Sequence, residues 1–226
     1  MRGLTIAIDG PSGAGKSTVA RSLASVLGYT YIDTGAMYRA VAWASLRDNI
    51  SLEDEMGQTE LTSQIQIKFV PKPEGGQSVL VDNFDVTDAI RMPVVTQLSS
   101  PVSAIPGVRK VLVAAQQQMG AAGGVVMEGR DIGTVVFPNA EVKVFLTATA
   151  EERARRRFAE LTTKGSNLSL QDILSQQQER DHRDSTRAQS PLKPAEDSAE
   201  ILSDGLSVEQ VVDQIIQLCN LRLKKL

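Results

Sequence analysis

The chain carries, at residues 10–18, the sequence Gly10-Pro11-Ser12-Gly13-Ala14-Gly15-Lys16-Ser17-Thr18. This stretch directly follows an apolar run at residues 4–8 and directly precedes a helical pattern of apolar residues. Glycines allow the backbone to curl so that successive amides point at phosphate oxygens. Lys16 can then reach the β and γ phosphates, and the Ser17 hydroxyl can ligate Mg²⁺. The stretch is therefore predicted to be a loop that binds a nucleoside triphosphate.

The composition limits the class of protein. The chain has 226 residues, with 42% hydrophobic and 23% charged content and a net charge of −3. These values suit one α/β domain with lobes, and they favour neither nucleic acid nor an anionic membrane as a partner. The single cysteine, Cys219, excludes an internal disulfide and a thiolate metal cage, and we expect it to be a packing residue. Because no apolar stretch reaches the length of a membrane span, we expect a soluble, cytoplasmic protein.

Strand and helix signals alternate along most of the chain. A helix is predicted directly after residue 18, and Gly28 supplies its end. Short apolar runs predict strands at residues 29–32, 125–127, 142–146 and, more weakly, 201–202. Strands separated by helices form a parallel sheet that is covered on both faces, and ligands bind beyond the carboxyl ends of its strands. We therefore predict an α/β fold with a P-loop parallel sheet covered by helices.

One segment breaks this alternation. Ile65, Ile67 and Phe69 alternate with polar residues, a turn is predicted at residues 71–76, and an apolar run follows at residues 79–81. This pattern is typical of a β-hairpin. We predict a small antiparallel β insertion over about residues 62–90.

Two later helices have recognisable beginnings. Thr149 is followed three residues later by Glu152, and Ser207 is followed by Gln210. Both pairs match the capping box. The second helix has an apolar stripe that we expect to pack in the core: Val211, Val212, Ile215 and Leu218.

The phosphate loop alone fits GTPases, transport ATPases, helicases and small-molecule kinases. The chain has no Asn-Lys-x-Asp tetrapeptide that would read guanine. It instead combines arginine with aspartate in three segments, at residues 33–39, 129–134 and 179–187. Guanidinium groups match phosphate geometry, whereas carboxylates accept hydrogen bonds from an exocyclic amine or a ribose hydroxyl. Such mixed sites favour a nucleotide as the acceptor.

Two arginine-rich helices are predicted next to each other. Arg180, Asp184 and Arg187 are spaced to share one helix face, either as part of a site or as solvated ion pairs. Upstream, four arginines fall within five residues: Arg153, Arg155, Arg156 and Arg157. Four neighbouring positive charges repel one another, so binding of a polyanion explains them better than a contribution to the stability of the helix does. A simple basic surface is the alternative. Residues 164–167 break the pattern, so the pair is predicted to be a helical hairpin that closes over phosphates. His182 lies among charges and is expected to be solvated.

Four sequence motifs together resemble those of bacterial cytidylate kinases, members of the nucleoside monophosphate kinase family. They are GPSGAGKST at 10–18, DTGAMYR at 33–39, GRDIGTVVFP at 129–138 and ERDHRDSTRAQSPL at 179–192. The resemblance runs nearly from end to end, and the β insertion looks like the extended monophosphate-binding lobe of these enzymes. It implies one P-loop kinase domain over residues 1–226, with that lobe at about 34–105 and an arginine-rich lid at about 150–190.

The resemblance also implies site residues. The ATP site comprises Gly10, Pro11, Ser12, Gly13, Ala14, Gly15, Lys16, Ser17 and Thr18. The CMP site comprises Thr34, Ser100, Arg109, Arg130, Asp131, Arg180, Asp184 and Arg187. Within it, Ser100, Arg130 and Asp131 read cytosine, Asp184 holds the ribose hydroxyls, and Arg109, Arg180 and Arg187 grip the acceptor phosphate. The implied catalytic residues are Lys16, Arg130, Arg153, Arg157, Arg180 and Arg187, and the metal ligand is Ser17.

Two positions depart mildly from the family pattern. Thr34 stands where some members have serine, and Glu128 stands where others have aspartate. Glu128 either orients the water shell of the metal or is a plain residue at a strand end.

The reaction implied by the resemblance is phosphoryl transfer from ATP, with Mg²⁺, to CMP or dCMP. Charge neutralisation and alignment suffice without a general base. A monomer that binds neither nucleic acid nor a membrane is expected. The open alternatives are another acceptor, such as UMP or a small alcohol, and a nucleotide-sensing scaffold without turnover.

Overall fold

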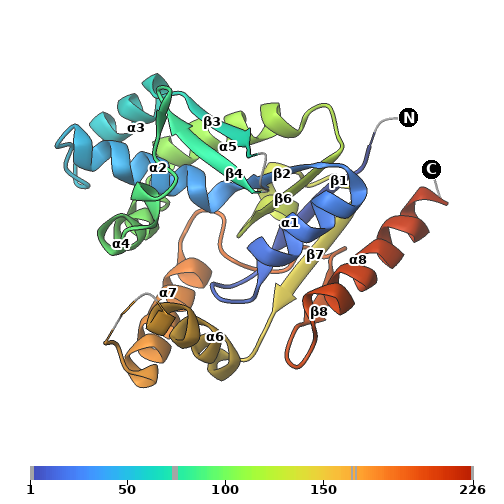
Figure 1. Cartoon of the computed structure of the whole chain (residues 1–226). Coiled ribbons are helices and arrows are strands. Elements are labelled where there is room, and N and C mark those ends of the chain that lie inside the picture. The colour runs from blue at the N-terminus through green and yellow to red at the C-terminus, as the bar shows by residue number, and fades with distance from the viewer. Residues whose placement is uncertain (1–2, 73–75, 164, 166, 225–226) are drawn as a thin grey trace. The chain divides into compact units, whose positions relative to one another are not determined.

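The computed structural model describes residues 3–72, 76–163, 165 and 167–224, and it divides into two compact units (Figure 1). The first, here called the P-loop unit, contains the chain up to Tyr31 and from Ala122 onward. The second, here called the inserted unit, is Ile32–Ala121. None of the helices within the described part of the chain combines the length and the hydropathy of a membrane span.

A five-stranded sheet carries the P-loop unit. Its strands are β1 (Thr5–Asp9), β2 (Thr30–Asp33), β6 (Val125–Gly129), β7 (Val142–Thr147) and β8 (Ala199–Leu202), in the order β2-β6-β1-β7-β8. The division between the two units falls within β2, after Tyr31. The central strand β1 pairs in parallel with both β6 and β7, and β7 pairs in parallel with β8. The predicted strands are therefore confirmed, with bounds that move by a few residues. The carboxyl ends of β1 and β6 lie side by side, because Asp9 is in register with Gly129.

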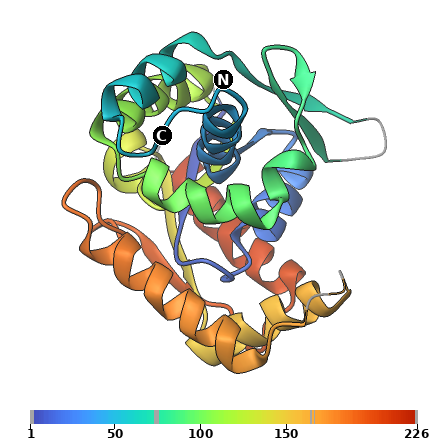
Figure 2. The same cartoon turned by 90° about the vertical axis from the view of Figure 1, so that its left-hand side faces the viewer.

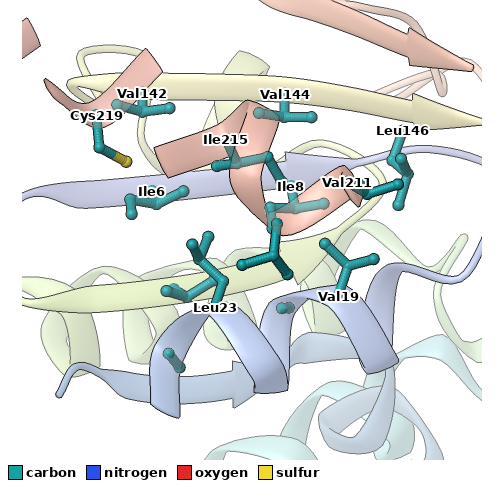
Figure 3. Close-up of a cluster of buried hydrophobic side chains, with 14 of the residues drawn as sticks. Ile6, Ile8, Val19, Leu23, Val142, Val144, Leu146, Val211, Ile215 and Cys219 are labelled. Atoms are coloured by element: carbon teal, nitrogen blue, oxygen red, sulfur yellow. The ribbon is translucent and has the colours of Figure 1, made fainter. Parts of the chain in front are cut away.

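Helices α1 (Lys16–Leu27) and α8 (Val208–Leu223) pack in one hydrophobic cluster with the sheet (Figure 3). Ile6 and Ile8 point from β1 into this cluster and are fully buried. Cys219 is buried there too, which confirms its predicted packing role. Gly28 ends α1 with φ 66°, a left-handed conformation that glycine adopts without a steric penalty. Burial of apolar area in this cluster fixes α1, and with it the loop that precedes α1.

The remaining helices of the P-loop unit are α6 (Ala150–Thr163), α7 (Leu170–Thr186) and the π-helical turn η2 (Ile132–Val136). Helices α6 and α7 pack against each other, as Figure 2 shows. A complete capping box at Ser169 and Asp172, which was not predicted, begins α7. The breaker predicted at 164–167 includes residues 164 and 166, which lie outside the described residues.

The two predicted capping boxes differ in outcome. The box at Ser207 and Gln210 is confirmed at the start of α8. At α6, the Thr149 hydroxyl accepts from the amide of Glu152 at 3.3 Å, but the reciprocal bond is absent among the described contacts. The Thr149 amide donates instead to the carboxylate of Asp204, at 3.0 Å, and Glu152 pairs with arginines. The prediction of a full box at Thr149 was therefore wrong, because Arg155 and Arg156 pair with the Glu152 carboxylate and Asp204 accepts from the Thr149 amide.

The inserted unit is mainly helical, with a separate small sheet. Its helices are α2 (Thr34–Arg47), α3 (Glu55–Gln64), the 3₁₀ turn η1 (Ala89–Arg91), α4 (Pro93–Val102) and α5 (Pro106–Gly120). Its strands are β3 (Ile67–Pro71), β4 (Gln77–Val81) and β5 (Phe84–Asp85), in the antiparallel order β3-β4-β5. One hydrophobic cluster joins α2, α4 and α5 to β4.

The predicted β insertion is present with different bounds. Residues 62–64 belong to α3, and β3 begins only at Ile67. The predicted turn includes residues 73–75, which lie outside the described residues. The third strand was not predicted, although Asp82 and Asn83 connect β4 to β5 with φ values of 51° and 69°. Two residues with positive φ are the mark of a tight hairpin turn, and an Asp-Asn pair is a recognisable signal for one.

Candidate active site

The phosphate loop takes the curled shape that its glycines predicted. Gly10, Gly13 and Gly15 all have positive φ, at 149°, 80° and 90°. A Cβ atom at Gly10 would overlap the carbonyl oxygen of Leu146 at the end of β7. The loop therefore needs glycine for both backbone conformation and close approach, and Gly15 leads directly into the amino end of α1.

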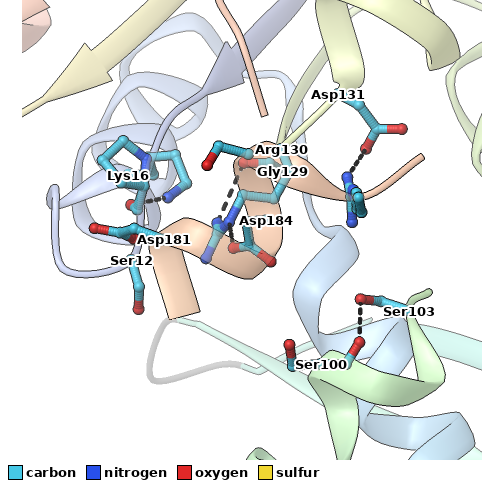
Figure 4. Close-up of polar contacts among 12 residues, drawn as sticks. Ser12, Lys16, Ser100, Ser103, Gly129, Arg130, Asp131, Asp181 and Asp184 are labelled. Atoms are coloured by element: carbon cyan, nitrogen blue, oxygen red, sulfur yellow. Dashed lines mark hydrogen bonds and ion pairs between the residues drawn. The ribbon is translucent and has the colours of Figure 1, made fainter. Parts of the chain in front are cut away.

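Lys16 lies buried inside this loop, with 6% of its surface exposed. Its ammonium group donates to the carbonyl oxygen of Pro11 at 2.7 Å (Figure 4). Burial, together with the positive charges of Arg130 and Arg180, lowers the pKa of Lys16 to about 7. The charged form of Lys16 is thus disfavoured in the loop despite the carboxylates of Glu128 and Asp9, and a bound polyphosphate would stabilise it.

The donor set at the loop fits a magnesium ion. Ser17 is the second residue of α1 and is half-buried. Among the described residues, no group of three His, Cys, Asp or Glu side chains could hold a metal by itself. Magnesium commonly takes one or two protein ligands and completes its shell with substrate phosphates and water. Glu128, at the end of β6, is buried and accepts a hydrogen bond from the Tyr31 hydroxyl.

An ion pair links the segment after β6 to helix α7. The Arg130 Nε atom lies 2.8 Å from Asp184 Oδ2, and the side chains are 19% and 8% exposed (Figure 4). Next to it, Arg187 approaches Asp131 with 3.8 Å between Nη2 and Oδ1. The structure therefore brings together four residues that the resemblance assigned to the CMP site, from two segments more than fifty residues apart.

The charge of Asp184 is stabilised by its surroundings. Burial opposes ionisation, yet Arg130, followed by Arg180 and Arg187, holds the pKa of Asp184 below its usual range. Burial likewise opposes the charge of Arg130, whose pKa is nevertheless raised, mainly by Asp184. Arg180 and Asp184 lie on α7, whereas Arg187 comes just after its end with an extended ψ of 141°. The predicted shared helix face therefore holds for Arg180 and Asp184 but not for Arg187, and the three residues are half-buried or buried rather than solvated.

Arg153 connects α6 to both α7 and the phosphate loop. Its Nη1 atom lies 2.6 Å from Asp181 Oδ2 and 3.0 Å from the carbonyl oxygen of Ser12. Gln177 on α7 donates to the Arg153 carbonyl at 3.3 Å. A Cβ atom at Gly13 would lie 2.9 Å from Gln177 Nε2 and 3.1 Å from the Cβ atom of Arg153, so the loop passes close to both helices there. The helical pair therefore contacts the phosphate loop directly.

The other three arginines of α6 have separate partners. Arg155 pairs with Glu152 at 2.9 Å, and Arg157 pairs with Glu160 at 2.8 Å. Arg156 pairs with Glu152 and also donates to the side chain and the carbonyl of Ser203, at 3.0 and 2.9 Å. The Ser203 hydroxyl in turn donates to the carbonyl of Ala14 at 3.3 Å.

These partners separate the functions of the four arginines. Arg156, which was not among the predicted site residues, supports the phosphate loop through Ser203. Arg157 has no contact to that loop among the described interactions, so its implied catalytic role stays a prediction. His182 is exposed, as predicted.

The inserted unit contains the other three residues that the resemblance assigned to CMP. Thr34 begins α2 and is buried, directly after the N-cap residue Asp33. Arg109 on α5 is buried and donates to the Tyr38 hydroxyl at 3.2 Å and to the Ser103 carbonyl at 3.4 Å. Ser100 is half-buried on α4, and its carbonyl accepts from the Ser103 hydroxyl at 2.7 Å (Figure 4).

Asp9 is a buried charged residue that was not among the predicted site residues. It ends β1 immediately before Gly10 and is 5% exposed. Its two carboxylate oxygens accept from the amides of Ile132 and Gly133, at 2.8 and 2.7 Å. Burial raises the pKa of Asp9 to about 6, because its effect outweighs these two hydrogen bonds and the charge of Lys16. The signal available in the sequence was an aspartate at the end of an otherwise apolar strand.

The raised pKa of Asp9 predicts a pH dependence of stability. The folded state keeps the proton between about pH 4 and 6, where the unfolded chain has lost it, so stability from this group falls as pH rises through that window. A shift of about two pKa units corresponds to roughly 3 kcal/mol. Urea unfolding from pH 4 to pH 7 is therefore expected to show Asp9→Asn gaining stability relative to the wild type. A difference that stays constant with pH would contradict the shift.

Comparison with known proteins identifies the family. The model for the family described as cytidylate kinase matches residues 6–221. The chain is 52% identical to a cytidylate kinase of Carboxydothermus hydrogenoformans, over 95% of this chain and 96% of that protein. It is 50% identical to a cytidylate kinase of Syntrophotalea carbinolica, over 96% of this chain and 92% of that protein.

Two further proteins resemble this chain over only part of their length or only in fold. A bifunctional pantoate ligase/cytidylate kinase of Prochlorococcus marinus is 49% identical over 94% of this chain, which spans only 44% of that longer protein. A solved shikimate kinase of Bacteroides thetaiotaomicron has a TM-score of 0.50 at 13% identity, and the match covers 96% of this chain and 98% of that one. That likeness supports the P-loop fold alone. The family model and the relatives near 50% identity extend over almost the whole sequence, so the chain belongs to the cytidylate kinase family.

Proposed function

We propose that this protein transfers the γ-phosphoryl group of ATP to CMP or dCMP. The observation that carries the proposal is the ion pair of half-buried Arg130 and buried Asp184, with Asp131 and Arg187 beside it. An arginine–carboxylate cluster of this kind suits an acceptor that has both an anionic group and neutral hydrogen-bonding groups. Relatives near 50% identity that are named cytidylate kinase support the same reaction.

ATP is proposed to bind at the phosphate loop. The loop amides and the positive end of α1 favour the phosphates, and the Lys16 ammonium would exchange the Pro11 carbonyl for a phosphate oxygen. Mg²⁺, held by the Ser17 hydroxyl together with phosphate oxygens and water, would neutralise charge on the phosphates when bound. Arg153 and Arg157 on α6 are proposed to act on the transferring group.

CMP is proposed to use residues from several segments. Arg130, Asp131 and Ser100 would read cytosine, and Asp184 would accept from the ribose hydroxyls. Thr34 completes the proposed CMP set. Three arginines would bind the acceptor phosphate: Arg109, Arg180 and Arg187. Because the second ionisation of a phosphate monoester has a pKa near 6, the attacking oxygen is already ionised at neutral pH. The chain's residues therefore need to align and neutralise the reactants but not to remove a proton.

The helices α6 and α7 are proposed to form a lid, at about residues 150–190, that excludes water from the phosphates. Their contacts to the phosphate loop through Arg153 and Gln177 support this role. Exclusion of water limits the hydrolysis of ATP, which is the competing reaction. We further propose that residues of about 34–105 bind the monophosphate and that the protein acts as a cytoplasmic monomer.

A panel of acceptors tests the proposal. The purified protein is incubated with MgATP and, in turn, CMP, dCMP, UMP, AMP and shikimate, and the release of ADP is measured. The highest kcat/KM is expected for CMP or dCMP. A higher value for another acceptor would contradict the assignment, and tight ATP binding without transfer to any acceptor would favour a nucleotide-sensing scaffold.

A further inference from the structure

The carboxylate of Asp9 joins two segments that are more than 120 positions apart in the sequence. One oxygen accepts from the amide of Ile132 at 2.8 Å, and the other accepts from the amide of Gly133 at 2.7 Å. These two amides belong to the first residues of η2, and Asp9 is the last residue of β1. Both acceptor atoms are thus used to hold one short piece of backbone.

Residues with proposed roles in binding flank this connection on both sides. Gly10, the first residue of the phosphate loop, follows Asp9 directly, and Arg130 and Asp131 directly precede the clamped amides. The clamped backbone also has little space: a Cβ atom at Gly133 would lie 3.4 Å from Asp9 Oδ2 and 3.2 Å from Lys143 Cδ. A displacement at Asp9 would therefore move the segment that carries Arg130 and Asp131.

We propose that Asp9 is a positioning residue, which sets the placement of Arg130 and Asp131 relative to the phosphate loop. The inference rests on the proposed function, because it assigns those two residues to the monophosphate. Asp9 itself need touch neither nucleotide. It acts through two backbone hydrogen bonds, each to an amide that is buried with it.

The unfavourable burial of the Asp9 charge argues against a role that is limited to connecting β1 with η2. The charge of Asp9 is unfavourable in its buried site, where desolvation raises its pKa and the negative charge of Asp131 raises it further. Lys16 is the cation that opposes this effect, and the two amides are the hydrogen-bond donors. A neutral side chain could connect β1 to η2 with less desolvation. Only a carboxylate has two equivalent acceptors for two successive amides.

Asp9→Asn is the most conservative variant that tests this role. Asparagine keeps the size of the side chain and one acceptor oxygen, but its NH₂ group faces the second backbone amide as a donor facing a donor. We expect kcat/KM for CMP to fall about 10- to 100-fold, which is the effect of a small misplacement in a binding site. The KM for MgATP is expected to change less than about threefold, because the phosphate loop itself stays intact.

Ile8→Val is the matched control. Ile8 precedes Asp9 in the same strand and is fully buried, so its truncation weakens the core without touching the clamped amides. We expect a lower melting temperature with an unchanged KM for CMP. Equal increases in the KM for CMP and for MgATP in Asp9→Asn would overturn the proposal, as would an unchanged kcat/KM for CMP.

Amide hydrogen exchange measured without substrates gives a second, independent result. The amides of Ile132 and Gly133 are expected to exchange faster in Asp9→Asn than in the wild type or in Ile8→Val. Unchanged exchange would overturn the clamp whatever the acceptor is. A wild-type protein that leaves CMP unphosphorylated would instead refute the proposed function, so the two failures are distinguishable.

Discussion

Replacement of Lys16 by alanine is expected to lower kcat for phosphoryl transfer to CMP by about 10³-fold or more, which is the scale for removing a charged group that acts on the transferring phosphoryl. The fold is expected to persist. Lys16 is buried with a pKa lowered to about 7, and its only hydrogen bond among the described contacts is to the Pro11 carbonyl. Removing a desolvated cation of this kind costs little stability.

Lys16→Met separates the charge from the packing of the side chain. Methionine retains a similar length and fills the same space but has no positive charge. Steady-state assays and thermal unfolding are compared for the wild type and both variants. Near-normal turnover in either variant, at an unchanged melting temperature, would refute the role of the ammonium group in transfer.

The parallel sheet could be predicted from the sequence because its signals are local. A glycine-rich loop between an apolar strand and a helix specifies one strand–loop–helix unit, and apolar runs of β-branched residues specify the other strands. The same holds for the capping box at Ser207, whose partners are three residues apart. The short strand β5 (Phe84–Asp85) was missed because two exposed residues carry no hydrophobic pattern.

The partners of the site residues could not be predicted in the same way. Asp9 binds amides that are 123 and 124 positions away, and Arg156 reaches Ser203 across 47 positions. Such contacts depend on which strands become neighbours and not on spacing along one element. The arginines of α6 also could not be told apart from the sequence. Arg153 is buried and contacts Ser12 and Asp181, whereas Arg155 is exposed and pairs with Glu152.

Replacement of Asp184 by alanine is expected to raise the KM for CMP about 10- to 100-fold, as expected for the loss of hydrogen bonds to a charged group. The KM for MgATP is expected to change less than about threefold. The variant loses the proposed acceptor for the ribose hydroxyls. It also loses the carboxylate oxygen that lies 2.8 Å from Arg130 Nε. Because Arg130 stays largely buried without its carboxylate, the free energy of unfolding is expected to fall by about 3 kcal/mol.

Two further variants separate these effects. Asp184→Asn keeps one acceptor for Arg130 Nε but loses the charge, so an intermediate KM for CMP is expected. Glu179→Ala removes a carboxylate from the exposed side of the same helix and is expected to leave both KM values unchanged. If Asp184 binds the 2′-hydroxyl, its loss harms CMP more than dCMP, since dCMP lacks that group. Equal increases in the KM for CMP and MgATP would show that Asp184 supports the whole site and does not belong to the monophosphate subsite.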